Sequence, residues 1–173
     1  MARSATSIPG AVMTKEDLEP IAKICQEKDI YVISDEIYSE LTYGGQKHCS
    51  ISSLPGMKER TIVINGFSKA YAMTGWRLGY ALAPEVIAHQ MTKIHQFAIM
   101  CAPTTSQYAA IEAIKNGDAD IEKMCKSYDQ RRRFLLKKFE EIGLPCFEPH
   151  GAFYVFPCIK EFGITRAQLQ VPL

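Results

Sequence analysis

The sequence predicts an α/β fold, a mostly parallel sheet flanked by helices, and three observations support this. Short apolar runs suited to buried strands lie near residues 30–34, 61–65 and 78–82. Stretches with the helical spacing of apolar residues precede and follow these runs. The connection between the first two runs is long enough for a crossover, so we expect these two strands to be parallel.

Helical spacing and terminal signals predict four helices, at residues 15–27, 84–97, 102–115 and 118–142. Thr14 and Asp17 resemble a capping box at the start of the first helix. Pro20 lies inside that helix and should bend or weaken it. The hydroxyls of residues 104–106 are most simply N-terminal caps of the third helix.

Composition excludes several classes of function. The chain has 173 residues, enough for a domain with a sizeable core, and 47% of them are hydrophobic. A formal charge of +1 gives no electrostatic case for nucleic acid or an anionic membrane as partner. No apolar run approaches the roughly 20 residues that span a bilayer, and no N-terminal segment suggests secretion.

Cysteine and histidine spacing does not predict a metal site. The six cysteines include no CxxC pair, and the four histidines are scattered. We therefore expect no metal, reduced thiols and a cytoplasmic protein. His48 has no acid or second ligand spaced to it and is interpreted as a solvated loop histidine.

Polar side chains gather just past two of the predicted strands. Asp35 and Tyr38 follow the first strand, and Ser68, Lys69 and Arg77 follow the second. A lone lysine is most simply an exposed loop residue. An acid, a phenol, an amine and a guanidinium at one sheet edge instead indicate a cofactor site.

Two segments carry a family resemblance, SDEIY at 34–38 and NGFSKAYAMTGWRLGY at 65–80. They resemble the signature segments of the class I/II aminotransferases, fold-type I enzymes that use pyridoxal 5′-phosphate. The resemblance continues through residues 95–114 and 151–157. It implies part of the fold-type I large domain, followed by the beginning of a small α+β domain, and it makes the third strand antiparallel.

The resemblance implies a role for each residue of the cluster. Lys69 would form the internal Schiff base with pyridoxal phosphate and move protons at the substrate α-carbon, which requires an amine activated by its surroundings. Asp35 would pair with the pyridine nitrogen, and Tyr38 would donate to the ring phenolate oxygen. Arg77 would clamp the phosphate as a planar fork, and Ser68 would add a hydroxyl.

The sequence also departs from the family pattern. Gly66 stands where members often have serine or threonine, and residues 7–10 replace a turn whose asparagine touches the cofactor. A whole member is much longer. We expect its phosphate loop, its ring-stacking aromatic and its arginine for the substrate carboxylate to lie outside this chain, because the context of Arg166 does not match that arginine.

The expected organisation has four parts: a non-family leader at 1–9, part of the large domain at 10–117, a long connecting helix at 118–143, and a truncated start of the small domain at 144–173. Residues 151–157 read as a strand of the small domain. The basic run Arg131–Arg133 is interpreted as a solvated helix face, since acids flank it.

The sequence favours a parent aminotransferase that moves an amino group between an amino acid and a 2-oxo acid, with this chain inactive by itself. A lyase or synthase of the same fold and a non-catalytic folded fragment stay open. Strand residues such as Val32–Ile33 and Ile62–Ile64 would expose apolar side chains, so we expect self-association, most simply as a homodimer.

Overall fold

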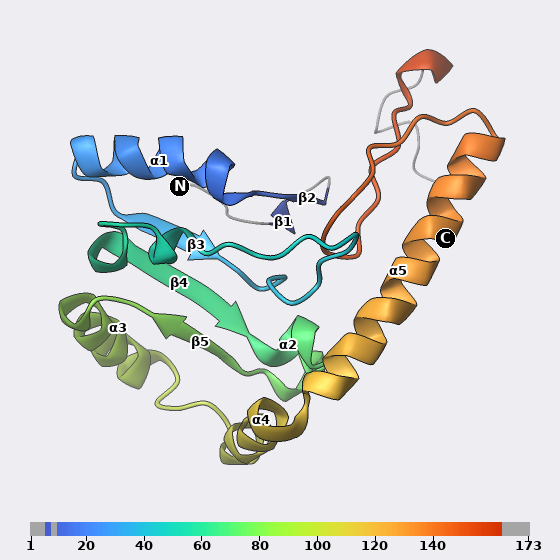
Figure 1. Ribbon diagram of the computed structural model, residues 1–173. Coiled ribbons are helices and arrows are strands. Elements are labelled where there is room, and N and C mark those ends of the chain that lie inside the picture. The colour runs from blue at the N-terminus through green and yellow to red at the C-terminus, as the bar shows by residue number, and fades with distance from the viewer. Residues whose placement is uncertain (1–5, 8–9, 164–173) are drawn as a thin grey trace.

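The computed structural model describes residues 6–7 and 10–163, and its centre is a three-stranded sheet in the order β3-β4-β5 (Figure 1). The strands are β3 (Val32–Asp35), β4 (Thr61–Gly66) and β5 (Gly79–Leu82). β3 and β4 are parallel, and β5 is antiparallel to β4. The predicted strands and their directions are therefore confirmed.

Five α-helices surround this sheet: α1 (Lys15–Glu27), α2 (Phe67–Ala70), α3 (Glu85–Ala98), α4 (Thr104–Asn116) and α5 (Asp118–Glu141). Figure 1 shows α1 on the β3 side of the sheet, α3 on the β5 side, and α5 crossing the end toward which β3 and β4 point. Short 3₁₀ turns lie at η1 (Ile51–Ser53), η2 (Lys58–Arg60), η3 (Thr74–Trp76) and η4 (Lys160–Phe162). The helices predicted from the sequence are confirmed to within about two residues at each end.

A two-stranded antiparallel pair precedes α1, formed by β1 (Thr6–Ser7) and β2 (Ala11–Val12). β1 lies in the stretch that we expected to be a leader. The remainder of that stretch, and Arg166 with the end of the chain, lie outside the described residues.

The capping box that begins α1 is confirmed. The Asp17 backbone N–H donates to the Thr14 hydroxyl at 3.3 Å, and the Thr14 backbone N–H donates to the Asp17 carboxylate at 2.9 Å. Pro20 does not interrupt the helix, which continues to Glu27. Tertiary packing of the apolar face offsets the hydrogen bond that proline removes.

The main core lies between α1 and one face of the sheet. Its buried members are Leu18, Ala22, Cys25, Val32, Ile51, Leu54 and Met57. The opposite face is more open, since Ile33 is 39% exposed. The expected exposure of apolar strand residues thus holds for Ile33 but not for Val32, which α1 covers, and not for Val63, which is 7% exposed.

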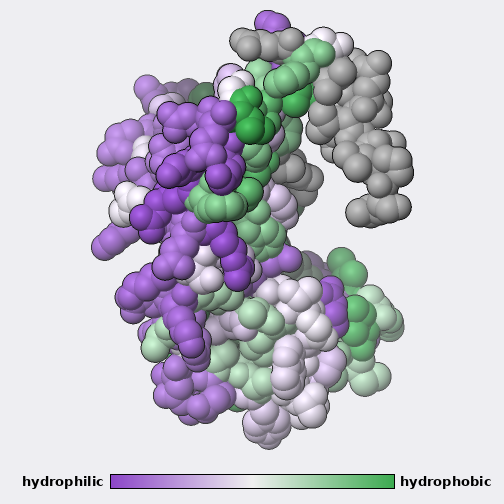
Figure 2. All heavy atoms as spheres, turned by 90° about the vertical axis from the view of Figure 1, so that its right-hand side faces the viewer, coloured by the Kyte–Doolittle hydropathy of each residue, from purple (hydrophilic) through white to green (hydrophobic). Residues whose placement is uncertain are grey.

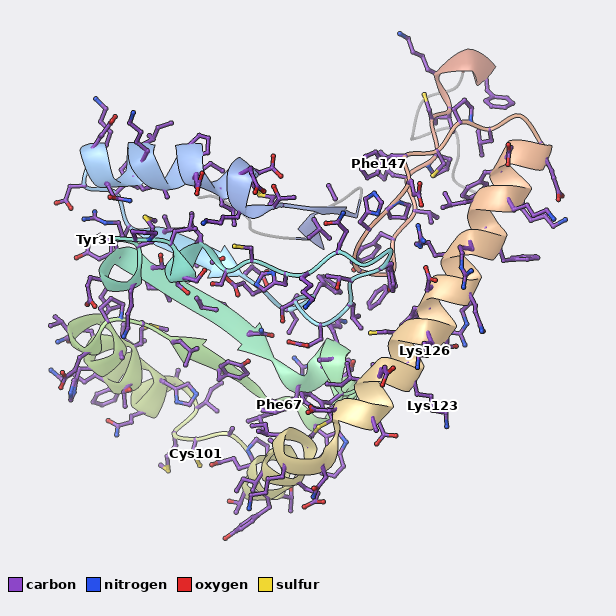
Figure 3. The ribbon with its side chains drawn as sticks, in the orientation of Figure 1. Tyr31, Phe67, Cys101, Lys123, Lys126 and Phe147 are labelled. Carbon is purple, nitrogen blue, oxygen red and sulfur yellow. The ribbon has the colours of Figure 1, made fainter. Side chains whose placement is uncertain are left out.

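A second cluster joins α2 to α4 through Phe67, Met73 and Ala110. Phe67 is labelled in Figure 3. The expected hydroxyl caps of α4 are not present. Pro103 occupies the N-cap position without a side-chain cap, and the Ser106 hydroxyl donates to the Trp76 carbonyl at 2.7 Å. Ser106 is buried, so its hydroxyl ties α4 to the η3 turn instead of capping the helix.

The prediction of a strand at 151–157 is wrong. Only isolated bridges form in this segment, between Thr42 and Gly151 and between Cys146 and Pro157. Ala152 has φ +57°, a left-handed conformation that interrupts extended backbone. Pro157 lacks the N–H that a ladder needs. Apolar composition indicated a strand, but the backbone turns at its second residue.

α5 has 24 residues and is therefore about 36 Å long. Figure 2 looks onto this side of the molecule and shows hydrophilic side chains over much of it. Lys123 and Lys126 lie on the outer side of the helix (Figure 3). Arg132 corrects the interpretation of 131–133 as a solvated face. It is only 9% exposed, because α5 places it against Glu148 and Pro149 of the following segment.

Within residues 6–7 and 10–163, no helix combines the length and apolar character needed to cross a membrane. The same residues contain no group of three or more acidic, histidine or cysteine side chains suited to a metal ion. All six cysteines are free thiols.

Candidate active site

The carboxyl end of β3 delivers Asp35 and Tyr38. Asp35 is the last residue of the strand and is exposed, and its carboxylate accepts from the Ile37 backbone N–H at 3.3 Å. The Glu36 backbone N–H donates to the Ile64 carbonyl at 2.8 Å, which continues the pairing with β4. The chain then turns, and Tyr38 becomes half-buried on the side of α5.

Lys69 follows the neighbouring strand because β4 runs directly into α2. Phe67 at the start of α2 is buried, which fixes the short helix and leaves Lys69 half-buried on its last turn. Parallel strands end at the same sheet edge, so Lys69 and Asp35 come from adjacent strand ends.

The packing of β4 against β5 explains why position 66 is a glycine. A Cβ placed there would lie 3.0 Å from the Gly79 Cα and 3.1 Å from the Leu78 carbonyl oxygen. The Gly66 backbone N–H donates to the Asn65 side-chain Oδ1 at 2.7 Å. β4 and β5 therefore approach each other closely at Gly66, the position where members of the resembled family often have serine or threonine.

An aromatic cluster connects Lys69 with Tyr38. The Lys69 Nζ lies 5.5 Å from the centre of the Phe153 ring, within the range of a cation–π contact. Phe153 in turn meets the Tyr38 ring edge-to-face, with 5.3 Å between ring centres. Tyr128 of α5 packs on Phe153 at 5.7 Å. The structure therefore brings Lys69 and Tyr38 to one aromatic ring.

The Tyr38 hydroxyl is hydrogen-bonded to the Tyr154 hydroxyl at 2.7 Å. Partial burial raises the pKa of Tyr38 well above its ordinary value, and the negative charge of Asp35 acts in the same direction. Tyr38 therefore stays protonated at any physiological pH and keeps a proton to donate.

Hydrogen bonds through Thr74 link Ser68 of α2 to Arg77 in the loop that follows. The Thr74 hydroxyl donates to the Ser68 carbonyl at 2.9 Å, and Arg77 Nη1 donates to the Thr74 carbonyl at 3.0 Å. Arg77 has φ +53°, a left-handed conformation that is uncommon outside glycine and often found at functional sites. It is exposed and lines an open depression together with Trp76, Pro103, Thr105 and Ser106.

This set of groups supports binding of an aldehyde-bearing, phosphorylated aromatic ring. An amine can attack an aldehyde, a carboxylate can pair with a protonated ring nitrogen, and a guanidinium suits a phosphate. Lys69 and Tyr38 meet at Phe153, while Ser68 of α2 is linked to Arg77 through their hydrogen bonds with Thr74.

A buried polar network beside the site was missed from the sequence. His48 is hydrogen-bonded through Nε2 to Glu36 at 2.7 Å, and the hydroxyls of Ser34 and Ser50 donate to the same carboxylate at 2.9 and 2.6 Å. The interpretation of His48 as a solvated histidine is therefore wrong. The alternation of β3 was the available signal, because Val32, Ser34 and Glu36 share the inward face.

The network sets the charge of Glu36. Burial raises the pKa of this carboxyl, but the hydrogen bonds from His48, Ser50 and Ser34 outweigh burial, and the pKa lies below its ordinary value of 4.5. An ionised carboxylate with three partners thus fixes the loop at 48–50 to the end of β3, one residue from Asp35.

Comparison with known proteins identifies the family. A family model described as aminotransferase class I and II matches residues 2–168. YugH of Bacillus subtilis (strain 168) is 53% identical over 165 residues, covering 95% of this chain and 42% of that protein. The aspartate aminotransferase of Pyrococcus abyssi is 49% identical over 161 residues, covering 92% of this chain and 41% of that enzyme.

A solved structure agrees with these sequence relatives. The aromatic aminotransferase from Pyrococcus horikoshii OT3 matches with a TM-score of 0.90 at 47% identity, covering 94% of this chain and 44% of that one. The fold is accordingly the α/β fold of fold-type I aminotransferases, as the resemblance implied. The chain spans about two fifths of the length of the relatives that it matches. The chain belongs to the class I and II aminotransferase family.

Proposed function

We propose that this chain carries part of the active site of a pyridoxal phosphate-dependent aminotransferase, which moves an amino group between an amino acid and a 2-oxo acid. The observation that carries the proposal is the meeting of Lys69 and Tyr38 at Phe153, beyond the ends of two parallel strands, in a chain of this family.

The residues present fit the cofactor by the chemistry of their side chains. Asp35 would pair with the ring nitrogen, Tyr38 would donate to the ring oxygen, and Arg77 and Ser68 would bind the phosphate. Lys69 would hold the cofactor covalently. Pyridoxal phosphate supplies an electron-accepting ring that stabilises negative charge at the substrate α-carbon.

Lys69 would also act as the general base and acid. Its Nζ would take the proton from the substrate α-carbon and, as the resulting ammonium group, would deliver a proton back within the same half-reaction. The cation–π contact with Phe153 keeps this amine next to the aromatic cluster. Tyr38, which remains protonated, would fix the ring while the proton moves.

Two alternatives share the same residues, a lyase or synthase of this fold and a non-catalytic folded fragment. The names of the relatives, an aspartate and an aromatic aminotransferase, favour transamination. Incubating the whole parent protein, of whose active site this chain would carry a part, with an amino acid and a 2-oxo acid separates the possibilities. A new amino acid and a new 2-oxo acid support transfer, release of ammonia supports a lyase, and no conversion supports the fragment.

We further propose a cytoplasmic homodimer. Six free thiols fit a reducing compartment, and exposed apolar side chains on α3 fit self-association. Since the chain matches about two fifths of its relatives' length, we expect the isolated chain to bind the cofactor without turning over amino acids.

The lysine assignment is tested by borohydride reduction of the chain with pyridoxal phosphate, followed by peptide mapping. We expect the label on Lys69, because it is the lysine held at the site. Lys69→Ala should abolish that label, whereas Lys115→Ala, a matched exposed control, should leave it unchanged. Label on Lys115 or Lys137 in the wild-type chain would contradict the assignment.

A further inference from the structure

The segment after α5 reaches the site through a backbone that is fixed from several sides. Arg132 Nη1 donates to the Pro149 carbonyl at 3.2 Å, and the Gly151 backbone N–H donates to the Gly10 carbonyl at 3.0 Å. The Ala152 backbone N–H donates to the Leu41 carbonyl at 2.9 Å. Residues 149–152 are therefore bonded to α5, to the start of the chain and to the loop after Tyr38.

The backbone conformation of Ala152 sets the direction of the next two side chains, Phe153 and Tyr154. It is 1% exposed and has φ +57°, a conformation that costs free energy for a residue other than glycine. The turn directs Phe153 onto Lys69 and brings the Tyr154 hydroxyl to the Tyr38 hydroxyl. The surrounding hydrogen bonds hold the strained turn, so the position of Tyr154 is set by the fold and not by its own exposed ring.

The hydroxyls of Tyr38 and Tyr154 carry two protons, and the hydrogen bond between them uses only one. A phenol has one proton to donate and can accept a second hydrogen bond. When Tyr154 donates to the Tyr38 oxygen, the Tyr38 proton is free for another acceptor. Accepting a hydrogen bond polarises the Tyr38 hydroxyl and makes it a stronger donor.

We propose that Tyr154 is a positioning residue, which donates to Tyr38 and so orients and strengthens the Tyr38 hydroxyl as donor to the ring oxygen of the bound cofactor. The inference rests on the proposed function. It assigns a role to a residue outside the two signature segments, separated from Tyr38 by 116 positions in the chain.

The test is a double-mutant cycle on the chain, with pyridoxal phosphate as the probe and its dissociation constant measured by absorbance titration. Tyr154→Phe keeps the ring and removes the hydroxyl. We expect affinity to weaken about three- to tenfold, the scale of one hydrogen bond. Tyr31→Phe, which removes a hydroxyl from an exposed ring just before β3, away from the aromatic cluster, should leave affinity unchanged.

The cycle distinguishes positioning from a purely structural role. In a Tyr38→Phe background, Tyr154→Phe should have no further effect, because its target oxygen is gone. The pH midpoint of the bound cofactor's absorbance change should rise by roughly half a unit in Tyr154→Phe alone, since a weaker donor stabilises the negative ring oxygen less.

Two results would overturn the inference: wild-type affinity in Tyr154→Phe, or equal weakening with and without the Tyr38 hydroxyl. A wild-type chain that fails to bind pyridoxal phosphate contradicts the proposed function itself. Binding by the wild-type chain together with either of the first two results contradicts the positioning role alone.

Discussion

Asp35 and Glu36 are adjacent carboxylates with opposite environments, because β3 sends successive side chains to opposite faces. Asp35 is exposed at the open edge, whereas Glu36 is 4% exposed and accepts three side-chain hydrogen bonds. Residue types and spacing were enough to predict Asp35, Tyr38 and Lys69 as candidates. His48 could not be paired with Glu36 from spacing, since a loop brings the two together across 12 positions.

Glu36→Gln should lower the free energy of unfolding at pH 7 by about 1.5–3 kcal/mol, the range for hydrogen bonds to a charged group. The folded pKa of Glu36 is depressed, so its stabilisation is complete above the ordinary value of 4.5 and is lost as pH falls through the folded pKa. Urea unfolding across pH should show the difference from the wild type shrinking in acid.

Glu40→Gln, at an exposed carboxylate on the same loop, is the control for this measurement and should change stability little at either pH. A wild-type advantage over Glu36→Gln that persists undiminished in strong acid would show that the carboxylate charge is not its source.

At the scale of elements, apolar periodicity correctly predicted the strands of the three-stranded sheet and the long helices. It also predicted a strand at 151–157, which the structure does not contain. Periodicity reports which side chains are apolar, but it does not reveal the left-handed turn at Ala152 that ends extended backbone there. Gly66 shows the same limit, since its meaning depends on the distance between β4 and β5.

Gly66→Ala should destabilise the chain by about 1–3 kcal/mol, because the new Cβ would lie 3.0 Å from the Gly79 Cα and must push the strands apart. Gly75→Ala is the matched control, since a Cβ there has no neighbour within 4 Å. Thermal unfolding of both variants checks the prediction, and equal stability of the two would contradict the close packing of β4 on β5.

Arg132→Met should cost about 1.5–3 kcal/mol, the range for hydrogen bonds to charged groups, because it leaves Asp129 and Glu148 without their donor. Arg132 is paired with Asp129 and Glu148 at 2.8 and 2.9 Å. Arg133→Met is a matched control on the next residue. Its side chain is 66% exposed although it also pairs with Asp129, so the expected cost is below about 1 kcal/mol. Similar urea midpoints for the two variants would refute the anchoring role of Arg132.

At the scale of the whole molecule, apolar side chains gather on the surface of α3. Phe97 is 96% exposed and Ile94 71% exposed. These two residues lie three positions apart and so share one face of the helix. Large apolar side chains at this exposure are typical of surfaces that bind another protein surface.

We expect the chain to self-associate at micromolar concentration through this surface. Size-exclusion chromatography with light scattering should give a mass above that of one chain, and the double variant Ile94→Ser, Phe97→Ser should shift the mass toward one chain. A control pair at polar exposed positions of the same helix, Gln90→Ser with Gln96→Ser, should not. A wild-type chain that runs as a clean monomer would contradict the prediction.

The hydrogen bond between Tyr38 and Tyr154 spans 116 positions, and the one between Tyr43 and Ala152 spans 109. Contacts this distant close large loops, whose entropy must be overcome before they contribute stability. The local parts of the site, the turn after β3 and the junction of β4 with α2, can form early. We therefore expect the aromatic side chains beside Lys69 to be among the last features to assemble during folding, after the strand ends that carry Asp35 and Lys69 are already formed.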